Sequence, residues 1–244
     1  MKIALIGYGK MGKEIEKTAL ERKHEIILCI DINNAEGFTI PELSKADVAI
    51  EFSTPAAAPS NILNCFRAGV PVVCGTTGWI EKIDEIKKIC LEKNQAFFYS
   101  SNYSIGVNIL FEINRRLAEI MNTRPDYDIS ITETHHTQKL DAPSGTAITL
   151  AEDILSRVKR KKNWINLRDA QPTGGEHTGE LPITSFRVQN VPGIHTIKYV
   201  SGVDSIELTH AAFSRKGFAL GAVLAAEWIQ GKKGTFGMQD MIRI

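Results

Sequence analysis

A dense group of chemically active side chains lies between Glu133 and Ala147, a span that reads E-T-H-H-T-Q-K-L-D-A-P-S-G-T-A. Two adjacent histidines, a lysine and two carboxylates occur within it. The apolar residues of the preceding run, 127–131, alternate as in a strand, and those of 147–158 have helical spacing. The group therefore occupies a strand-to-helix connection, where binding and catalytic residues are common.

The start of the predicted helix offers hydrogen-bond donors to an anion. Pro143 suits the first helical turn or the position before it, because its missing N–H group costs little there. Residues 144–146 then present backbone N–H groups at the positive end of the helix, which binds a carboxylate or a phosphate. His135, His136 and Lys139 can donate to the same anion. We therefore predict a pocket for a small, multiply charged anion with proton donors inside it.

The same residues also have more ordinary roles. Paired histidines and single lysines are common at surfaces and in cores, and Asp141 and Ser144 could simply cap the helix. Their coincidence ahead of a Gly-Thr helix start favours a site. We expect no metal here, because adjacent histidines on an extended chain point to opposite faces and no cysteine or carboxylate completes a known ligand spacing.

The beginning of the chain has the pattern of a dinucleotide-binding loop. An apolar strand at residues 2–6 is followed at once by Gly7, Gly9 and Gly12, and then by a helical run. Gly7 permits the tight turn, Gly9 lets a pyrophosphate approach the backbone, and Gly12 lets the helix pack on the strand. Asp31 ends the next apolar strand, about 20 residues on, where such folds place the ribose-binding carboxylate. A turn acid is the alternative for Asp31.

Strand and helix patterns alternate through residues 2–99. This βαβ repetition predicts a Rossmann-type doubly wound parallel sheet, in which ligands bind at the carboxyl ends of the strands. Small polar residues stand at these ends, although plain turn chemistry also explains each of them alone. They are residues 52–54, Gly75, Thr76, Thr77, Ser100, Ser101, Asn102 and Tyr103.

The pattern changes near Tyr103, which predicts a second domain. A long helix is expected at 106–121, and strands at 183–188, 196–200 and 205–211 indicate a mixed or antiparallel sheet. We expect residues 159–162 to be a solvated helix end and residues 163–181 to be a long loop. The apolar helix at 217–231 returns to the first domain, which gives a dinucleotide-binding domain of residues 1–103 and 215–244. We expect residues 104–214 to form a separate α+β domain.

The bulk composition limits the function. The chain has 244 residues and a formal net charge of +1, which disfavours a nucleic-acid binder that depends on phosphate attraction. Its four cysteines are widely spread and form no CxxC pair, as expected for reduced thiols in a cytoplasmic enzyme. No apolar stretch approaches membrane-spanning length, so we expect no membrane partner.

The sequence resembles the 4-hydroxy-tetrahydrodipicolinate reductase family, once called dihydrodipicolinate reductase, of bacterial lysine and diaminopimelate synthesis. The central motif of that family, E-x-H-H-x-x-K-x-D-A-P-S-G-T-A, is reproduced throughout by residues 133–147. Further blocks similar to the family occur in the same order over nearly the whole chain. These blocks are residues 7–12, 74–79, 101–108, 176–180 and 214–219.

The resemblance implies a reaction and a set of roles. The family reduces 4-hydroxy-tetrahydrodipicolinate to tetrahydrodipicolinate with NADH or NADPH, with loss of water, as a homotetramer built through its second sheet. The resemblance implies that His135 is the acid/base residue and that Lys139 is a second proton donor. It also implies that substrate carboxylates bind to His136 and to the backbone of Gly145 and Thr146. Arg215 belongs to a family block and is expected to contact the substrate or the closed domain interface, with a solvated hinge charge as the alternative. The implied cofactor-binding residues are Gly7, Gly9, Lys10, Met11, Gly12, Asp31, Gly75, Thr76, Thr77, Ser100, Ser101, Asn102 and Tyr103.

The cofactor preference depends on the residues around Asp31. A carboxylate there accepts hydrogen bonds from both ribose hydroxyls of NADH and repels the 2′-phosphate of NADPH. Many relatives offset that repulsion with an arginine after the acid, whereas residues 32–34 here read I-N-N. We expect NADH to be used at least as well as NADPH, although Lys10 or Lys13 could reach the phosphate instead. Many relatives also have an arginine in place of Lys10, which would contact pyrophosphate with a planar fork.

Two other functions are compatible with part of the sequence. A different two-domain nicotinamide enzyme, such as an amino-acid or semialdehyde dehydrogenase, would explain the first domain and not residues 133–147. A non-catalytic NAD-binding sensor would tolerate the loss of His135 or Lys139, and both are present. Tight binding of pyridine-2,6-dicarboxylate in the presence of NADH would separate the reductase from both.

Overall fold

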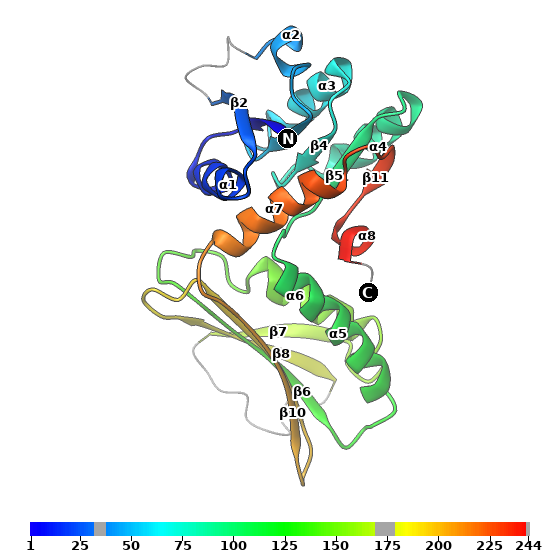
Figure 1. Cartoon of the computed structure of the whole chain (residues 1–244). Coiled ribbons are helices and arrows are strands. Elements are labelled where there is room, and N and C mark those ends of the chain that lie inside the picture. Colours follow the sequence, from blue (N-terminus) through cyan, green and yellow to red (C-terminus); the bar gives the residue numbers. More distant parts are fainter. Residues whose placement is uncertain (32–37, 169–178, 243–244) are drawn as a thin grey trace. The chain divides into compact units, whose positions relative to one another are not determined.

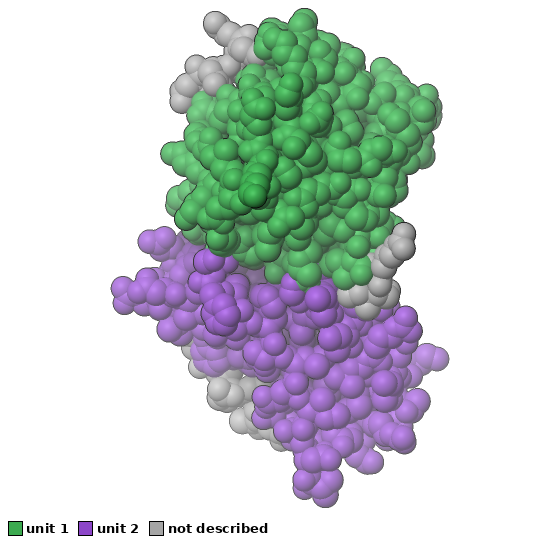
Figure 2. Space-filling view, viewed as in Figure 1, with its two compact units in different colours: residues 1–105, 215–244 green, residues 106–214 purple. Residues whose placement is uncertain are grey.

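The computed structural model describes residues 1–31, 38–168 and 179–242. The chain divides into two compact units (Figure 2), one made of Met1–Ile105 with Arg215–Ile244 and the other of Gly106–Ser214. Each unit has its own sheet and its own apolar core.

Unit 1 is built on a six-stranded sheet in the order β11-β5-β4-β3-β1-β2, in which every pair of neighbours is parallel (Figure 1). The strand order reverses at β1 and β3, because the chain runs outward from β1 to β2 and then crosses to the other side of β1. In such sheets ligands bind beside the carboxyl ends of the strands at this switch point. The strands are β1 (Lys2–Ile6), β2 (Glu25–Ile30), β3 (Val48–Glu51), β4 (Val72–Cys74), β5 (Ala96–Tyr99) and β11 (Gly234–Phe236).

Helices bury both faces of this sheet. On β1, Ile3 and Leu5 belong to the core that includes α1 and α7, whereas Ala4 and Ile6 belong to the core with α3 and α4. Neighbouring residues of a strand point to opposite faces, so a sheet covered on both sides needs nearly continuous apolar strands. The predicted Rossmann-type parallel sheet is confirmed. Its helices are α1 (Lys10–Glu21), α2 (Ile40–Leu43), α3 (Ala58–Ala68), η2 (Ile80–Lys82), α4 (Ile83–Glu92), α7 (Lys216–Trp228) and α8 (Met238–Ile242).

Unit 2 is built on a five-stranded sheet in the order β10-β9-β6-β8-β7. The pairs of β6 with β8 and of β7 with β8 are parallel, and the pairs of β6 with β9 and of β9 with β10 are antiparallel. The predicted mixed sheet is therefore confirmed. Its elements are α5 (Ile105–Met121), β6 (Asp128–His135), α6 (Gly145–Leu155), β7 (Asn163–Arg168), β8 (Glu180–Arg187), β9 (Gly193–Val200) and β10 (Ser205–Ala212).

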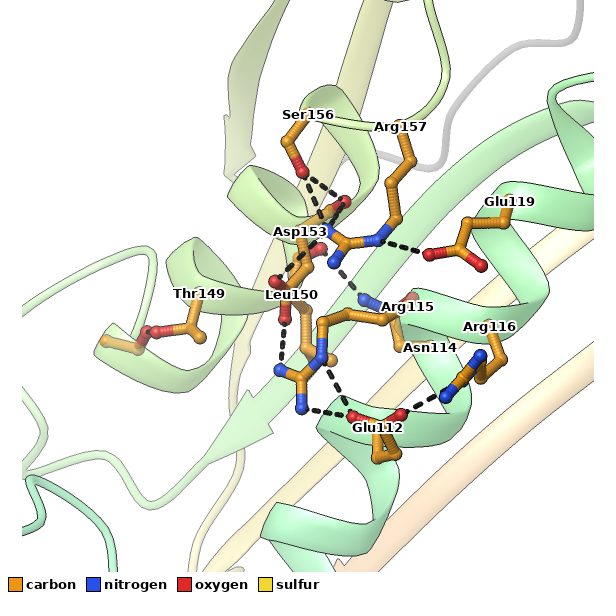
Figure 3. Close-up of polar contacts among 11 residues, drawn as sticks. Glu112, Asn114, Arg115, Arg116, Glu119, Thr149, Leu150, Asp153, Ser156 and Arg157 are labelled. Carbon is orange, nitrogen blue, oxygen red and sulfur yellow. Dashed lines mark hydrogen bonds and ion pairs between the residues drawn. The ribbon is translucent and has the colours of Figure 1, made fainter. Parts of the chain in front are cut away.

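A polar network fastens α6 to α5 (Figure 3). Arg115 on α5 donates from Nη2 to Glu112 at 2.6 Å and from Nη1 to Asp153 on α6 at 3.2 Å. Beside it, the buried Asn114 donates from Nδ2 to the carbonyl of Leu150 at 3.1 Å. These contacts lie over a shared apolar core with Leu110, Leu150 and Ile183 among its members. The network therefore fixes α6 over the sheet, and with it the helix start that the sequence places beside the histidines.

The prediction of a loop at 163–181 was wrong at both ends, because its last two residues, Glu180 and Leu181, belong to β8 and its first six form another strand. Residues Asn163–Arg168 form β7, which pairs in parallel with β8 from Asn163 opposite Glu180 to Arg168 opposite Ser185. The strand is at the edge of the sheet and contains polar residues, so its pattern was obscured by the Gly-, Pro- and Thr-rich residues after it. The rest of that loop, residues 169–178, lies outside the described residues, as do residues 32–34 behind the cofactor argument and most of the family block 176–180.

The prediction that residues 159–162 are a solvated helix end was wrong at Lys161. Lys161 is only 4% exposed, and its Nζ lies 2.7 Å from Asp128 Oδ1 and 2.6 Å from the carbonyl oxygen of Glu180. A buried ammonium group needs such partners. Both come from distant parts of the chain, so the local run of charges could not reveal them.

None of the helices in residues 1–31, 38–168 and 179–242 combines the length and the apolar content that crossing a bilayer requires.

Candidate active site

The apolar face of the unit 2 sheet becomes polar along one row of residues. Ile131 on β6 is paired with Ile183 on β8 and with Ile197 on β9, and all three side chains are buried in the core. Two residues further along β6, Glu133 faces the same side. Its partners on those two strands are Ser185 and His195. The register of the sheet thus brings together polar residues from three strands at the margin of an apolar core.

Glu133 and His135 form a buried pair at the end of β6. Glu133 has no exposed surface and His135 is 8% exposed. The carboxylate Oε2 of Glu133 contacts Nδ1 of His135, and its Oε1 accepts from Arg187 Nη1 at 3.0 Å. Burial raises the pKa of Glu133, but hydrogen bonds from His135 and Ser185, the charge of His135 and the hydrogen bond from Arg187 outweigh burial and lower the pKa to about 2. Glu133 is therefore ionised near neutral pH, and its acceptor oxygen assigns the Nδ1 proton to His135.

His195 lies beside this pair in neutral form. Its ring centroid is 5.0 Å from that of His135 at an interplanar angle of 71°. Burial, followed by the charge of His135, lowers the pKa of His195 to about 3. Its Nε2 lies 2.9 Å from the hydroxyl of Ser144, which also accepts from the backbone N–H of Ala147 as the N-cap of α6. His195 therefore joins the histidine cluster to the start of α6.

Gly145 and Thr146 are the first two residues of α6. The N–H groups in the first turn of a helix point along its axis at the positive end of the helix dipole, which suits a carboxylate. The predicted strand-to-helix connection and the predicted helix start are thus present. His136, next to His135, is half-buried, and its Nδ1 makes no hydrogen bond within the described part of the chain.

The loop between His136 and α6 is held by side chains of β7 and β8. Lys139 donates from Nζ to both carboxylate oxygens of Asp141, at 2.9 and 2.8 Å. Burial opposes the ionisation of Asp141, but the hydrogen bond and the charge of Lys139 dominate and lower the pKa of this carboxyl. Arg187 binds the carbonyl oxygens of Lys139 and Asp141, and Asn166 donates to that of Ala142 at 3.1 Å. These hydrogen bonds hold the backbone of the loop on which Lys139 lies.

Gly193 provides the space next to Nε2 of His135. A Cβ atom added to Gly193 would lie 2.9 Å from His135 Nε2 and 3.2 Å from its Cδ2. The ring therefore lies where the side chain of any other residue would begin. A larger residue at 193 would therefore displace the imidazole, whose Nδ1 contacts Glu133.

Sequence reasoning missed three of these residues, namely Ser185, Arg187 and His195. Each of them is a polar residue near the end of a strand, at a position where the alternating pattern of that strand predicts a buried apolar residue. That departure from the pattern is the signal that could have identified them. The argument against a metal also missed that Glu133 and His195 are cross-strand partners. Ligand atoms of Glu133, His135 and His195 all lie within 4.8 Å of one another. Arg187 Nη1 already donates to the other oxygen of Glu133 at 3.0 Å, and this cation disfavours a second positive charge, such as a metal ion, at the same carboxylate.

The glycine loop in unit 1 has the tight turn at Gly7 and the close helix packing at Gly12 that the sequence predicted. Gly7 has φ +97°, and a Cβ there would lie 2.1 Å from the carbonyl oxygen of Phe52. A Cβ on Gly12 would lie 2.2 Å from the carbonyl oxygen of Gly7, so α1 packs tightly against the loop. Around Gly9 the same test finds nothing within 4 Å, which leaves space for a pyrophosphate to approach the backbone. Lys10 and Met11 occupy the first turn of α1, with Lys10 exposed.

The other predicted cofactor residues follow neighbouring strands of the same sheet. Gly75, Thr76 and Thr77 come after β4, Ser100, Ser101, Asn102 and Tyr103 come after β5, and Asp31 comes directly after β2. Thr76 Oγ1 accepts from the backbone N–H of Ser53 at 2.8 Å, which ties the ends of β4 and β3 together. The side chain of Tyr103 is in the core and donates to the carbonyl oxygen of Cys74 at 2.8 Å, so a cofactor can meet only its backbone.

A buried carboxylate that sequence reasoning missed organises these ends. Glu51, the last residue of β3, has no exposed surface, and its oxygens accept from Ser53, Asn61 and Cys74. Arg215, the remaining predicted residue, is the exposed N-cap position of α7. The structure thus groups the predicted cofactor residues in unit 1 and the predicted acid/base and anion residues in unit 2.

Comparison with known proteins identifies the family. Family models described as "Dihydrodipicolinate reductase, N-terminus" and "Dihydrodipicolinate reductase, C-terminus" match residues 1–103 and 106–242. The chain belongs to the dihydrodipicolinate reductase family. The 4-hydroxy-tetrahydrodipicolinate reductase of Christiangramia forsetii is 47% identical over 99% of this chain and 98% of that protein. That of Methanosarcina mazei is 36% identical over 98% and 88%, respectively.

Solved structures show the same fold. The dipicolinate-bound dihydrodipicolinate reductase from Paenisporosarcina sp. TG-14 is similar with a TM-score of 0.80 over 98% of both chains, at 23% sequence identity. A probable dehydrogenase from Thermotoga maritima is more distant, with a TM-score of 0.56 and 11% identity over 100% of this chain and 93% of that one. As a member of the dihydrodipicolinate reductase family, the chain is an NAD(P)H-dependent oxidoreductase that acts on 4-hydroxy-tetrahydrodipicolinate in lysine and diaminopimelate biosynthesis.

Proposed function

We propose that His135 is the general acid/base of the reduction to tetrahydrodipicolinate and that Glu133 is its carboxylate partner. The observation that carries this proposal is the contact between Glu133 and His135 Nδ1, which leaves Nε2 for the substrate. The nicotinamide supplies a hydride when it is bound, and the ring that accepts the hydride then needs a proton. An ionised carboxylate on Nδ1 stabilises the imidazolium that gives this proton from Nε2.

Lys139 is proposed as the second proton donor. Its bidentate contact with Asp141 directs the ammonium group, and the side chain is 23% exposed, so it remains within reach of a ligand. The loss of water from the substrate requires a proton on the departing hydroxyl, which an ammonium group can supply. Two donors on the same connection thus serve the two proton transfers of the reaction.

The substrate is a ring with two carboxylates, and the site offers two sets of donors for them. The first turn of α6, at Gly145 and Thr146, suits one carboxylate. His136 Nδ1, buried and without a partner among the described residues, suits the other. The Paenisporosarcina relative, in which dipicolinate is bound, supports a planar ring dicarboxylate as the ligand. Arg215 is proposed as a further substrate contact.

The cofactor is proposed to bind unit 1, with its pyrophosphate at Gly7, Gly9, Lys10, Met11 and Gly12. Asp31 would bind the ribose, so NADH would serve at least as well as NADPH. The proposed domains are residues 1–103 with 215–244 for the dinucleotide and residues 104–214 for substrate binding and assembly. By resemblance to the family, the assembly is a homotetramer.

The experiment is steady-state kinetics of His135→Ala and Lys139→Ala in an assay coupled to the preceding synthase, with NADH absorbance as the readout. Each variant should lose at least about 100-fold in kcat, as removal of a general acid does. NADH affinity should stay unchanged, because unit 1 carries the cofactor residues. Lys45→Ala is the matched control, since Lys45 pairs with Glu42 at 2.7 Å on the surface of unit 1. Near-normal turnover of either site variant would remove that residue from the mechanism.

A further inference from the structure

Arg187 occupies a central position among the residues assigned above. It is the last residue of β8 and is paired with His135 across the parallel ladder of β6 and β8. Its side chain is only 21% exposed, whereas the carboxylate that it meets, Glu133, is fully buried. Arg187 is therefore half-buried, with its guanidinium group directed at a fully buried carboxylate.

The guanidinium group of Arg187 uses each of its three nitrogens. Nη1 donates to Glu133 Oε1 at 3.0 Å and to the carbonyl oxygen of Phe186 at 2.7 Å. Nε donates to the carbonyl oxygen of Lys139 at 3.2 Å, and Nη2 to that of Asp141 at 2.6 Å. One rigid planar group therefore binds the carboxylate behind His135 and, at the same time, the backbone on both sides of residue 140.

We propose that Arg187 is a positioning residue that sets the two proton donors of the reaction, His135 and Lys139, in fixed relation to each other. It acts on His135 through Glu133 and on Lys139 through the loop backbone. This inference rests on the roles proposed above for the histidine and the lysine.

The chemistry of the contacts explains why an arginine is needed. A buried carboxylate requires a cation or several hydrogen bonds, and the carbonyl groups of an irregular loop require donors. The five N–H groups of a guanidinium, fixed in one plane, reach acceptors on opposite sides at once. A lysine at 187 would keep the charge for Glu133 but would have a single nitrogen for acceptors that Nε, Nη1 and Nη2 now share.

Loss of the side chain should disturb both donors. Without Arg187, Glu133 would lose its permanent cation and would no longer be fixed to accept from His135 Nδ1. The carbonyl oxygens of Lys139 and Asp141 would lose their donors, so the loop could move. Displacement by about 1 Å at a reacting group can cost about 100-fold in rate. The expected signature is a fall in kcat of about this size with an unchanged KM for NADH.

The test uses the full-length enzyme with Arg187→Ala and Arg187→Lys. The coupled assay should show kcat lower by about 100-fold for the alanine variant and by roughly tenfold for the lysine variant, which keeps only the charge. Added guanidinium ion should raise the turnover of Arg187→Ala at least about tenfold, because the ion can bind where the guanidinium group of Arg187 was removed. Nitrogen NMR of the histidine rings, with His135 assigned through His135→Ala, should show the proton on Nδ1 in the wild type and a mixture of tautomers in Arg187→Ala.

Arg160 supplies the matched control. It also donates from both Nη nitrogens to backbone carbonyls of unit 2, those of Met121 at 2.9 Å and Tyr127 at 2.8 Å. Neither of these bonds, within the described part of the chain, involves a residue assigned to the site. Arg160→Ala should lower the melting temperature and leave both kcat and the His135 tautomer unchanged.

The outcomes separate the two proposals. Unchanged kcat and an unchanged His135 ring signal in Arg187→Ala would overturn the positioning role. If Arg160→Ala loses as much activity as Arg187→Ala, the loss reflects lower stability of unit 2, and the positioning role is also overturned. If His135→Ala itself keeps its turnover, the proposed function fails, while the ring signal in Arg187→Ala still decides whether Arg187 positions the histidine. If Arg187→Ala does not fold, Arg187→Lys decides by its kcat and its ring signal.

Discussion

Replacing Gly193 with alanine adds one methyl group beside Nε2 of His135, the nitrogen that we propose acts on the substrate. The new Cβ would lie 2.9 Å from Nε2, whereas ordinary contact begins at 3.4 Å, so the ring and the methyl group must separate by about 0.5 Å. The backbone of Gly193 is not in the left-handed region, so alanine is not strained by its own conformation. The ring cannot simply turn away, because Glu133 holds its other nitrogen.

The magnitude follows from this overlap. Added atoms in a packed site typically cost about 1–3 kcal/mol of stability, and this contact is a single methyl group, so about 1–2 kcal/mol is expected. If 1 Å of displacement costs about 100-fold in rate, half of that displacement costs about tenfold in kcat. KM for NADH should not change, because the residues proposed to bind the cofactor belong to unit 1.

The assay combines kinetics with thermal unfolding of Gly193→Ala, His135→Ala and the double variant. The stability cost of the methyl group should largely disappear when His135 is also alanine, because the double variant removes the atoms that collide. Gly202→Ala is the matched control, since a Cβ at Gly202, in the same unit, would meet nothing within 4 Å. Wild-type kcat and melting temperature in Gly193→Ala, or an equal stability cost in both histidine backgrounds, would refute the reasoning.

Two further predictions concern pH and the cofactor. The folded pKa of His195 is about 3, against about 6.5 in an unfolded chain, so below pH 6.5 only the unfolded state takes up this proton. The unfolding free energy should therefore be highest above pH 6.5 and fall by up to several kcal/mol as the pH drops toward 3. The melting temperature of His195→Gln should depend less steeply on pH than that of the wild type. An equally steep dependence would show that His195 does not cause the loss of stability. Comparison of kcat/KM should give a ratio of NADH to NADPH of one or more that falls by roughly tenfold in Asp31→Ala, because two like charges near 4 Å at a surface repel by up to about 4 kcal/mol before screening. A clear preference for NADPH in the wild type would show that Asp31 does not read the ribose.

The sequence by itself determined those features that depend on local pattern. Continuous apolar strands such as residues 2–6 are needed in a parallel sheet buried on both faces, and that requirement is visible in a short window. The glycines at 7, 9 and 12 are also a local signal, because turn geometry and helix packing act within a few residues. The helix start after Ser144 and both histidines of the motif were likewise recognisable, since a few consecutive residues specify them.

Only the tertiary structure decided which side chains support His135. Arg187 lies 54 residues after Glu133, and Ser144 lies 51 residues before His195, so no local pattern links them. Glu133, Arg187 and His195 meet because the register of β6 with β8 and β9 aligns the polar ends of three apolar stripes. Register is a property of the whole sheet, fixed by burying the row of Ile131, Ile183 and Ile197, and it cannot be read from any one strand. The partners of Lys161 were hidden for the same reason, because they come from two distant strands.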